Sequence, residues 1–159
     1  MEKNMVIVGI DVGQNGGIAV VQDRVLLDAI RMPTLTVRTK QAVDAVVIHQ
    51  WVAQFGRVDH VVIEQVSAMP RQGVSSTFQF GRMLGGIECV VQQWGAPMSY
   101  VTPAVWKRAM GLTSDKQASI DAAHTAFGSR ARELIRFKAD DGLAEAALLA
   151  LYWRQEIGG

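Results

Sequence analysis

The stretch Met5-Val-Ile-Val-Gly-Ile-Asp-Val-Gly-Gln-Asn-Gly-Gly-Ile-Ala-Val-Val21 carries the strongest structural pattern in the chain. Its first part, residues 5–11, is rich in Val and Ile and is typical of a buried strand. The glycines at positions 13, 16 and 17 predict a tight turn. The apolar run Ile18–Val21 then predicts a second strand, so that Asp11 lies where a strand meets a glycine-rich turn.

The rest of the chain supplies strands and helices in an order that indicates an α/β fold. The apolar pattern predicts strands at 25–30, 58–64 and 97–101, and helices at 39–55, 75–94, 103–110, 116–127 and 141–153. We therefore predict a mixed five-stranded sheet with helices on both faces, in which the first strand and the strand at 58–64 are neighbours. A chain of 159 residues is expected to form a single domain, residues 1–159.

The composition excludes several classes of protein. Hydrophobic residues make up 49% of the chain, which argues against a disordered protein. The apolar runs are short, so no transmembrane helix is predicted, and the N-terminal Met-Glu-Lys-Asn does not resemble a signal peptide. A lone cysteine, Cys89, excludes an intrachain disulfide and fits a cytoplasmic location. Its apolar surroundings predict that Cys89 is a small core residue.

Acidic residues from distant parts of the chain occupy positions that such a fold brings together. Asp11 and Glu64 each end an apolar run, and Asp141 and Glu145 open the last predicted helix, with Asp140 as an alternative. Open sheets carry their sites at the carboxyl ends of the strands. Carboxylates are ligands for hard divalent cations, so the set indicates metal-assisted phosphoryl chemistry. Taken singly, each acid would be interpreted as an ordinary cap or turn residue.

The formal net charge of +1 says little about binding partners, but the positions of the charged residues along the chain are informative. Residues 107–138 contain seven basic and only three acidic residues. The basic ones are Lys107, Arg108, Lys116, Arg130, Arg132, Arg136 and Lys138. A basic region beside an acidic cluster fits a nuclease that grips phosphates, while a solvated helix face remains the alternative.

Five segments occur in an order that resembles the RuvC-type Holliday junction resolvases of the RNase H-like superfamily, and most closely their short phage-type members. They are Ile10-Asp-Val-Gly, Val62-Ile-Glu-Gln-Val66, Gly81-Arg-Met-Leu-Gly-Gly86, Thr102-Pro-Ala-Val-Trp-Lys107 and Asp140-Asp-Gly-Leu-Ala-Glu-Ala146. The resemblance implies a homodimer that binds four-way DNA junctions and nicks one strand per subunit. It also implies two Mg²⁺ or Mn²⁺ ions per active site, held by four carboxylates.

Carried over by position, the resemblance assigns Asp11, Glu64, Asp141 and Glu145 as catalytic metal ligands. Lys107 would neutralise charge near the scissile phosphate, with a solvated helix position as the alternative. Further DNA contacts would come from Arg71, Arg108, Lys116, Arg130 and Arg132.

The chain departs from the bacterial pattern at two of these places. Its last two acids are four residues apart rather than three, and the second is Glu145 rather than Asp. Asp140 offers another first acid, but a spacing of five rotates the side chains far apart around a helix, so Asp141 is preferred. Ser67 replaces the aromatic residue that the bacterial members insert at the junction centre. Met69 or Phe78 could take that role, although a core position is the preferred interpretation of Phe78.

The predicted helix at 75–94 contains three glycines, Gly81, Gly85 and Gly86, which weaken an isolated helix. They indicate close approach by another backbone, either of this chain or of a second subunit. In the dimer that the resemblance implies, Phe80, Met83 and Leu84 are the expected apolar contacts.

Other functions remain open at this point. Asp11-Val-Gly-Gln-Asn-Gly-Gly17 also resembles the first phosphate motif of the actin and sugar-kinase superfamily, but no second phosphate loop is present. The chain could be another RNase H-like nuclease, acting on flaps or RNA–DNA hybrids. It could also be a DNA-binding relative that has lost activity, although the intact set of acids argues against this.

Overall fold

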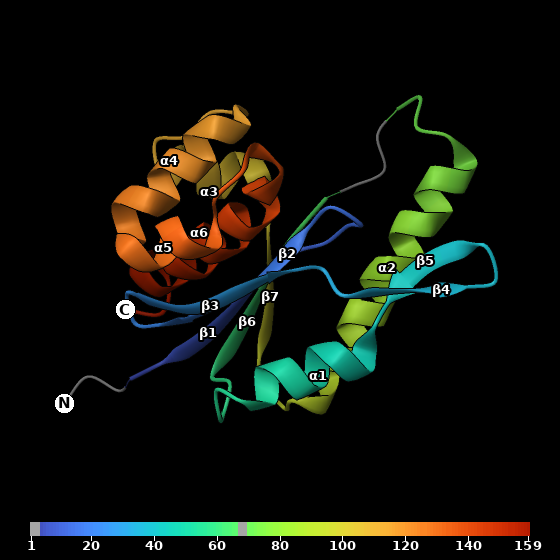
Figure 1. Cartoon of the computed structure of the whole chain (residues 1–159), viewed down its shortest axis with the longest axis horizontal. Coiled ribbons are helices and arrows are strands. Elements are labelled where there is room, and N and C mark those ends of the chain that lie inside the picture. Colours follow the sequence, from blue (N-terminus) through green and yellow to red (C-terminus); the bar gives the residue numbers. More distant parts are fainter. Residues whose placement is uncertain (1–3, 67–69) are drawn as a thin grey trace.

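The computed structural model describes residues 4–66 and 70–159, and its centre is a five-stranded mixed sheet (Figure 1). The strand order is β3-β2-β1-β6-β7. The strands are β1 (Val6–Asp11), β2 (Gly17–Gln22), β3 (Val25–Arg31), β6 (His60–Glu64) and β7 (Met98–Val101). The first three pair antiparallel, whereas β6 pairs parallel with both β1 and β7. The predicted neighbourhood of the first strand and the strand ending at Glu64 is therefore confirmed.

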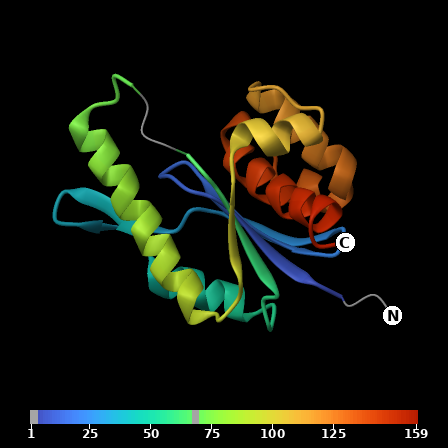
Figure 2. The ribbon, with the colours of Figure 1, turned by 180° about the vertical axis from the view of Figure 1, so that it is seen from behind.

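Helices cover both faces of this sheet, which confirms the predicted fold class (Figures 1 and 2). One face carries α1 (Ala45–Ala53) and α2 (Val74–Gln93). The other carries α3 (Pro103–Ala109), α4 (Lys116–Phe127), α5 (Ser129–Leu134), the short 3₁₀ turn η1 (Lys138–Asp140) and α6 (Asp141–Glu156). The helix α5 was not predicted from the sequence.

The two faces have separate hydrophobic cores because strand side chains alternate. On β1, Ile7 belongs to the core beneath α4 and α6, whereas Val8 and Ile10 belong to the core beneath α1 and α2. Both cores are closed by apolar side chains from sheet and helices. In the described part of the chain, no helix is long and apolar enough to cross a membrane.

Two glycines in the sheet allow α6 to lie directly on β1 and β2. A Cβ at Gly9 would overlap the Ala146 carbonyl of α6, and a Cβ at Gly17 would lie 2.8 Å from the Gly142 carbonyl oxygen. A larger residue at either position would push the helix outward. Since Gly17 pairs with Asp11 across the strands, this packing brings the first turns of α6 to the end of β1.

The predicted helix at 39–55 is wrong over its first part. Two short antiparallel strands, β4 (Thr34–Val37) and β5 (Lys40–Val43), form a hairpin there, and α1 begins only at Ala45. The Asp44 backbone N–H donates to the Pro33 carbonyl at 2.9 Å and closes the hairpin base. The Asp44 side chain caps α1 by accepting from the Val47 N–H at 3.1 Å. A helix that starts at its cap cannot extend back through residues 39–43.

The predicted long helix is confirmed as α2, but several of its side chains face the other way from the prediction. Met83 is buried in the core beneath α1 and α2 and is not available to another subunit, whereas Phe80 and Leu84 pack against that core and are partly buried. Phe78 and Cys89 are exposed, so the expectation that both are core residues is wrong.

The three glycines of α2 do not share one role. A Cβ at Gly86 would meet Val43 of the hairpin, so Gly86 serves packing within the chain. Gly81 and Gly85 face open space, because a Cβ at either position would have nothing described within 4 Å. These two, with Phe78, Arg82 and Cys89, form the outward face of α2.

Candidate active site

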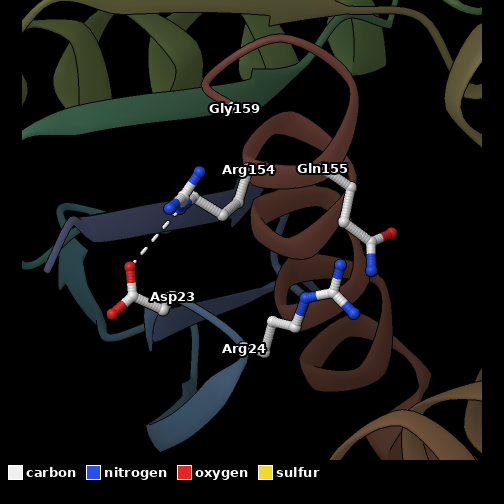
Figure 3. Close-up of a pocket in the computed structure, with 5 residues that line it drawn as sticks. All are labelled: Asp23, Arg24, Arg154, Gln155 and Gly159. Atoms are coloured by element: carbon white, nitrogen blue, oxygen red, sulfur yellow. Dashed lines mark hydrogen bonds and ion pairs between the residues drawn. The ribbon is translucent and has the colours of Figure 1, made fainter. Parts of the chain in front are cut away.

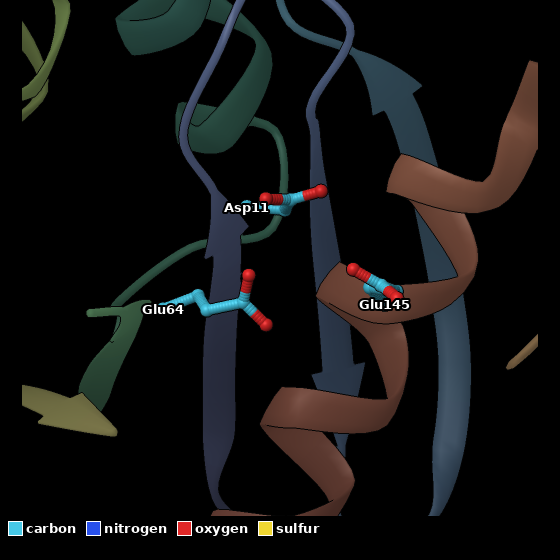
Figure 4. A group of neighbouring side chains, drawn as sticks. All are labelled: Asp11, Glu64 and Glu145. Atoms are coloured by element: carbon cyan, nitrogen blue, oxygen red, sulfur yellow. The ribbon is translucent and has the colours of Figure 1, made fainter. Parts of the chain in front are cut away.

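Three of the four predicted acids converge at one end of the sheet. Asp11 ends β1 and Glu64 ends β6, and these strands are parallel with Ile10 opposite Ile63, so their last residues emerge side by side. Glu145 comes from the second turn of α6. Each residue offers a carboxylate oxygen, and the three oxygens lie within 4.8 Å of one another. Figure 4 shows the three side chains directed toward a common point.

The fourth predicted acid, Asp141, lies one turn before Glu145 on the same helix. Its carboxylate pairs with Lys116, with Oδ2 3.1 Å from Nζ, and it is not within the compact group of three. It remains close enough for its charge to act on Asp11. Asp141 also lines a pocket of about 310 Å³ together with Gln14, Asn15, Arg31, Lys116 and Ala139.

The alternative acid, Asp140, is committed to other contacts. Its Oδ1 accepts from Arg31, with Nη2 at 2.6 Å, and its Oδ2 accepts from the backbone N–H groups of Arg136 and Phe137 at 2.9 and 2.8 Å. These bonds join the start of α6 to β3 and to the preceding loop. The carboxylate does not cap α6 itself, contrary to the expectation for a residue at this position.

Donors from α3 and α4 hold two of the three clustered acids. The Trp106 indole Nε1–H donates to Glu64 Oε2 at 2.7 Å, and the Lys107 Nζ lies 2.7 Å from Glu145 Oε1. The Ser119 hydroxyl donates to the same Glu145 oxygen at 3.3 Å. Trp106 and Ser119 are fully buried. Sequence reasoning assigned neither of them a role, because both look like core residues of amphipathic helices.

The electrostatics of the cluster favour a bound cation. Burial raises the pKa of Asp11 well above its ordinary value of 3.8, and the charges of Glu64 and Glu145 add to the increase. Burial also raises the pKa of Glu64 above 4.5, against the effect of the Trp106 hydrogen bond. Lys107 offsets only part of this repulsion. Crowded carboxylates with raised pKa values are characteristic of functional sites.

The predicted DNA-binding residues differ in exposure and in the protein groups that they contact. Arg71, Arg108, Lys116 and Arg132 are exposed, whereas Lys107 lies within the acidic site. Arg130 is tied to β3, since its guanidinium donates to the Leu27 carbonyl at 2.9 Å and pairs with Asp28 and Glu133. Of the residues considered for the junction centre, Ser67 and Met69 lie outside the described residues, and Phe78 is exposed on α2.

A second pocket, of about 240 Å³, lies at the opposite end of the sheet (Figure 3). It is lined by Asp23, Arg24, Arg154, Gln155 and Gly159. Here the acid is paired, because Asp23 Oδ1 accepts from the Met5 N–H at 3.1 Å and from Arg154 Nε at 3.4 Å.

Comparison with solved protein structures finds others with the same fold. At the level of sequence, no protein-family model and no curated protein matches the chain. Thermus thermophilus RuvC, solved in complex with a Holliday junction substrate, matches over 95% of this chain and 96% of its own, with a TM-score of 0.63 and 20% identity. The fowlpox virus Holliday junction resolvase matches over 96% of this chain and 100% of its own, with a TM-score of 0.60 and 13% identity.

These likenesses span nearly the whole chain, from the first strand to the last helix, as the five sequence segments predict. At such low identity they concern the arrangement of the backbone and not the activity. The fold of this chain is that of the RuvC-type resolvases, an RNase H-like fold.

Proposed function

We propose that this chain is a metal-dependent endonuclease that nicks four-way DNA junctions and other branched DNA. The observation that carries the proposal is the convergence of Asp11, Glu64 and Glu145 at the end of β1 and β6. The acids come from three distant parts of the sequence, and burial, with repulsion between them, raises the pKa values of Asp11 and Glu64. Such an arrangement lowers stability, and a bound cation would offset the loss.

The donor set fits Mg²⁺ or Mn²⁺. All the ligands are carboxylate oxygens, which hard divalent cations prefer, and no His or Cys belongs to the cluster. We propose that Asp11, Glu64, Asp141 and Glu145 together hold two ions. Bound there, the metal would activate water as the nucleophile and stabilise charge on the phosphate.

The chain's own residues would hold the ligands and the DNA. Lys107 pairs with Glu145, and we propose that its ammonium group would also offset charge on the scissile phosphate. Because water is the nucleophile, no Ser or Cys nucleophile is needed. Arg71, Arg108 and Arg132 are exposed and available to phosphates, and Lys116 is exposed but also pairs with Asp141. Arg130 is a weaker candidate because its guanidinium already has protein partners.

We further propose that the active form is a homodimer of single-domain subunits, working in the cytoplasm. The outward face of α2 supports this, since Gly81 and Gly85 leave room for a second helix to approach. Phe78, 74% exposed near the start of that face, is the candidate for stacking against bases at the junction centre.

The test is a cleavage assay on labelled four-way junctions, flaps, linear duplex and RNA–DNA hybrids, with Mg²⁺, Mn²⁺ or EDTA. We expect metal-dependent paired nicks in the junction, weaker cleavage of flaps and none of linear duplex. The Asp11→Asn variant, purified identically, excludes a contaminating nuclease. Preferred cleavage of the hybrid would assign the chain to the other RNase H-like nucleases, and junction binding without any cleavage would indicate an inactive relative.

A further inference from the structure

The short helix α3 contacts two of the three clustered acids through consecutive residues. Trp106 donates to Glu64, which ends β6, and Lys107 pairs with Glu145 on α6. The two acids therefore belong to different elements but share one support. This helix starts at Pro103, two residues after β7 ends, so the edge strand sets its position.

Of these two donors, Trp106 is the more constrained. Its side chain is 0% exposed and belongs to the core beneath α4 and α6, so packing fixes the direction of its indole N–H. A phenylalanine would fill most of the same apolar space without a donor. The bond to Glu64 Oε2 is 2.7 Å, at the short end of the range for an N–H donor. What the indole adds to the apolar ring is a fixed hydrogen bond to Glu64.

The bond also restricts the orientation of the Glu64 carboxylate. A glutamate has three side-chain torsions, and Glu64 sits at the end of a strand where its carboxylate must turn toward Asp11 and Glu145 (Figure 4). The indole holds one oxygen of the carboxylate and thereby limits how the whole group can rotate. Residues that orient metal ligands in this way typically change metal affinity or activity by about 10–100-fold when they are removed.

We propose that Trp106 is a positioning residue of the active site, which holds the Glu64 carboxylate in its ligating orientation through the indole N–H. The proposal rests on the proposed function, because it assumes that Glu64 ligates a divalent cation. It differs from a purely structural role for Trp106, in which only the volume of the ring matters and a residue of similar shape would serve as well.

The chain offers a matched control for this bond. Trp51 on α1 also donates its indole N–H to a carboxylate, Asp28 Oδ2, at 3.3 Å. Neither Trp51 nor Asp28 belongs to the acidic cluster. Trp51→Phe therefore removes the same kind of bond at a place where no effect on the site is expected.

The decisive experiment compares wild type, Trp106→Phe and Trp51→Phe in two assays. The first measures binding of Mn²⁺ alone by calorimetry, without DNA, and the second measures junction nicking against Mg²⁺ concentration. We expect Trp106→Phe to need about 10–100-fold more metal for half-saturation in both assays. Its maximal rate should recover in excess metal, and its junction binding in EDTA should equal that of wild type. Trp51→Phe should match wild type throughout.

A Trp106→Phe variant with wild-type metal affinity and metal dependence would overturn the proposal. If the variant does not fold, 3-benzothienylalanine introduced at position 106 decides the matter, since sulfur replaces the N–H with almost no change of shape. Wild-type metal binding in that protein would overturn the proposal equally, and the loss described above would support it. A wild-type protein that neither binds Mn²⁺ nor nicks junctions would instead contradict the proposed function itself.

Discussion

The two ends of the central sheet treat acidic residues in opposite ways. Where β1 begins, Asp23 accepts bonds from Arg154 and from the Met5 backbone, and Asp59 accepts from the Val6 backbone. Where β1 ends, Asp11, Glu64 and Glu145 face one another, and Lys107 is the basic side chain that pairs within the cluster. The first arrangement satisfies its charges inside the chain, whereas the second leaves negative charge to be neutralised from outside.

Paired and crowded carboxylates should therefore respond differently to substitution. A paired carboxylate supports the fold, and its loss should lower stability. A crowded carboxylate strains the fold, and its loss should raise stability while abolishing activity. The contrast also distinguishes two sequence neighbours. Asp140 is held by Arg31 and by backbone N–H groups, whereas Asp141 lies beside the cluster and pairs with the exposed Lys116. Variants of the two kinds, tested side by side, show whether paired and crowded carboxylates differ in this way.

The largest effect is expected at Asp11. Replacing it by Asn removes the charge at the centre of the cluster with little change of volume, so nicking should fall by several orders of magnitude while junction binding persists. The measurement is single-turnover cleavage beside a gel-shift assay in EDTA. Asp23→Asn, at the paired end, should nick normally. Equal activity of wild type and Asp11→Asn would remove Asp11 from the site.

Asp11→Asn should also differ from wild type in thermal stability, by an amount that depends on pH. Because the pKa of Asp11 is raised on folding, the metal-free protein is destabilised once the pH exceeds the unfolded value near 3.8, and increasingly so up to the folded value. Asp11→Asn should therefore melt above wild type at neutral pH, by about 2–4 °C for each 1 kcal/mol relieved, and the gap should close toward pH 4. Thermal melts across this range check the sign, and adding Mg²⁺ should stabilise wild type alone.

The next effect distinguishes Asp140 from Asp141. Asp141→Asn should lose most of its cleavage and, because its ion pair is with the exposed Lys116, at most about 1 kcal/mol of stability. Asp140→Asn should keep most of its cleavage and lose about 1–3 kcal/mol. Despite its burial, hydrogen bonds from Arg31 and two backbone N–H groups hold the pKa of Asp140 below 3.8. Its stabilisation is thus present above the unfolded pKa and disappears as the pH falls through the folded value. Denaturant titrations at several pH values and cleavage assays separate the two residues, and a reversed pattern would exchange their roles.

Much of the fold follows from the sequence because the apolar periodicity is strong. Buried runs of Val and Ile specify β1 and β6, and the acids that end them meet because the strands are parallel neighbours. The hairpin of β4 and β5 escaped prediction because Val43 and the apolar residues of α1 happen to fit one helical spacing. The signal that could have corrected it was Asp44, a typical helix cap between the two segments.

The residues that hydrogen-bond to the clustered acids could not be predicted from the apolar pattern. Trp106 and Ser119 lie among apolar residues, and a pattern of hydrophobicity treats them as core positions. Whether an indole N–H reaches a carboxylate depends on how α3 is placed against β6, which only the three-dimensional packing determines. The orientation of α2 was similarly ambiguous, because its apolar residues surround much of the helix and do not reveal that Met83 faces inward and Cys89 outward.

A smaller effect is expected from the outward face of α2. A Cβ at Gly85 has nothing described within 4 Å, so Gly85→Leu should leave the subunit stable while the proposed dimer weakens and paired nicking becomes independent single nicks. Gly86→Leu would collide with Val43 and should destabilise the subunit itself. Sedimentation at micromolar concentration and thermal melts distinguish the two. A wild-type protein that stays monomeric with and without junction DNA contradicts the dimer.

The smallest effect is expected from the basic residues, where an arginine with protein partners can be compared with exposed arginines. Arg130 already has partners on β3 and α5, whereas Arg108 and Arg132 are exposed. Each phosphate contact on a duplex arm contributes about 0.9 to the slope of log affinity against log salt. Neutralising Arg108 and Arg132 together should flatten that slope by up to about twice this amount while leaving turnover on saturating DNA nearly unchanged. Arg130→Gln should lower stability and leave the slope as it is, because its charge is neutralised within the protein. Junction binding measured across a salt series decides the question: if Arg130→Gln flattens the slope and the double variant does not, the DNA contacts Arg130, where α5 meets β3, and not Arg108 and Arg132.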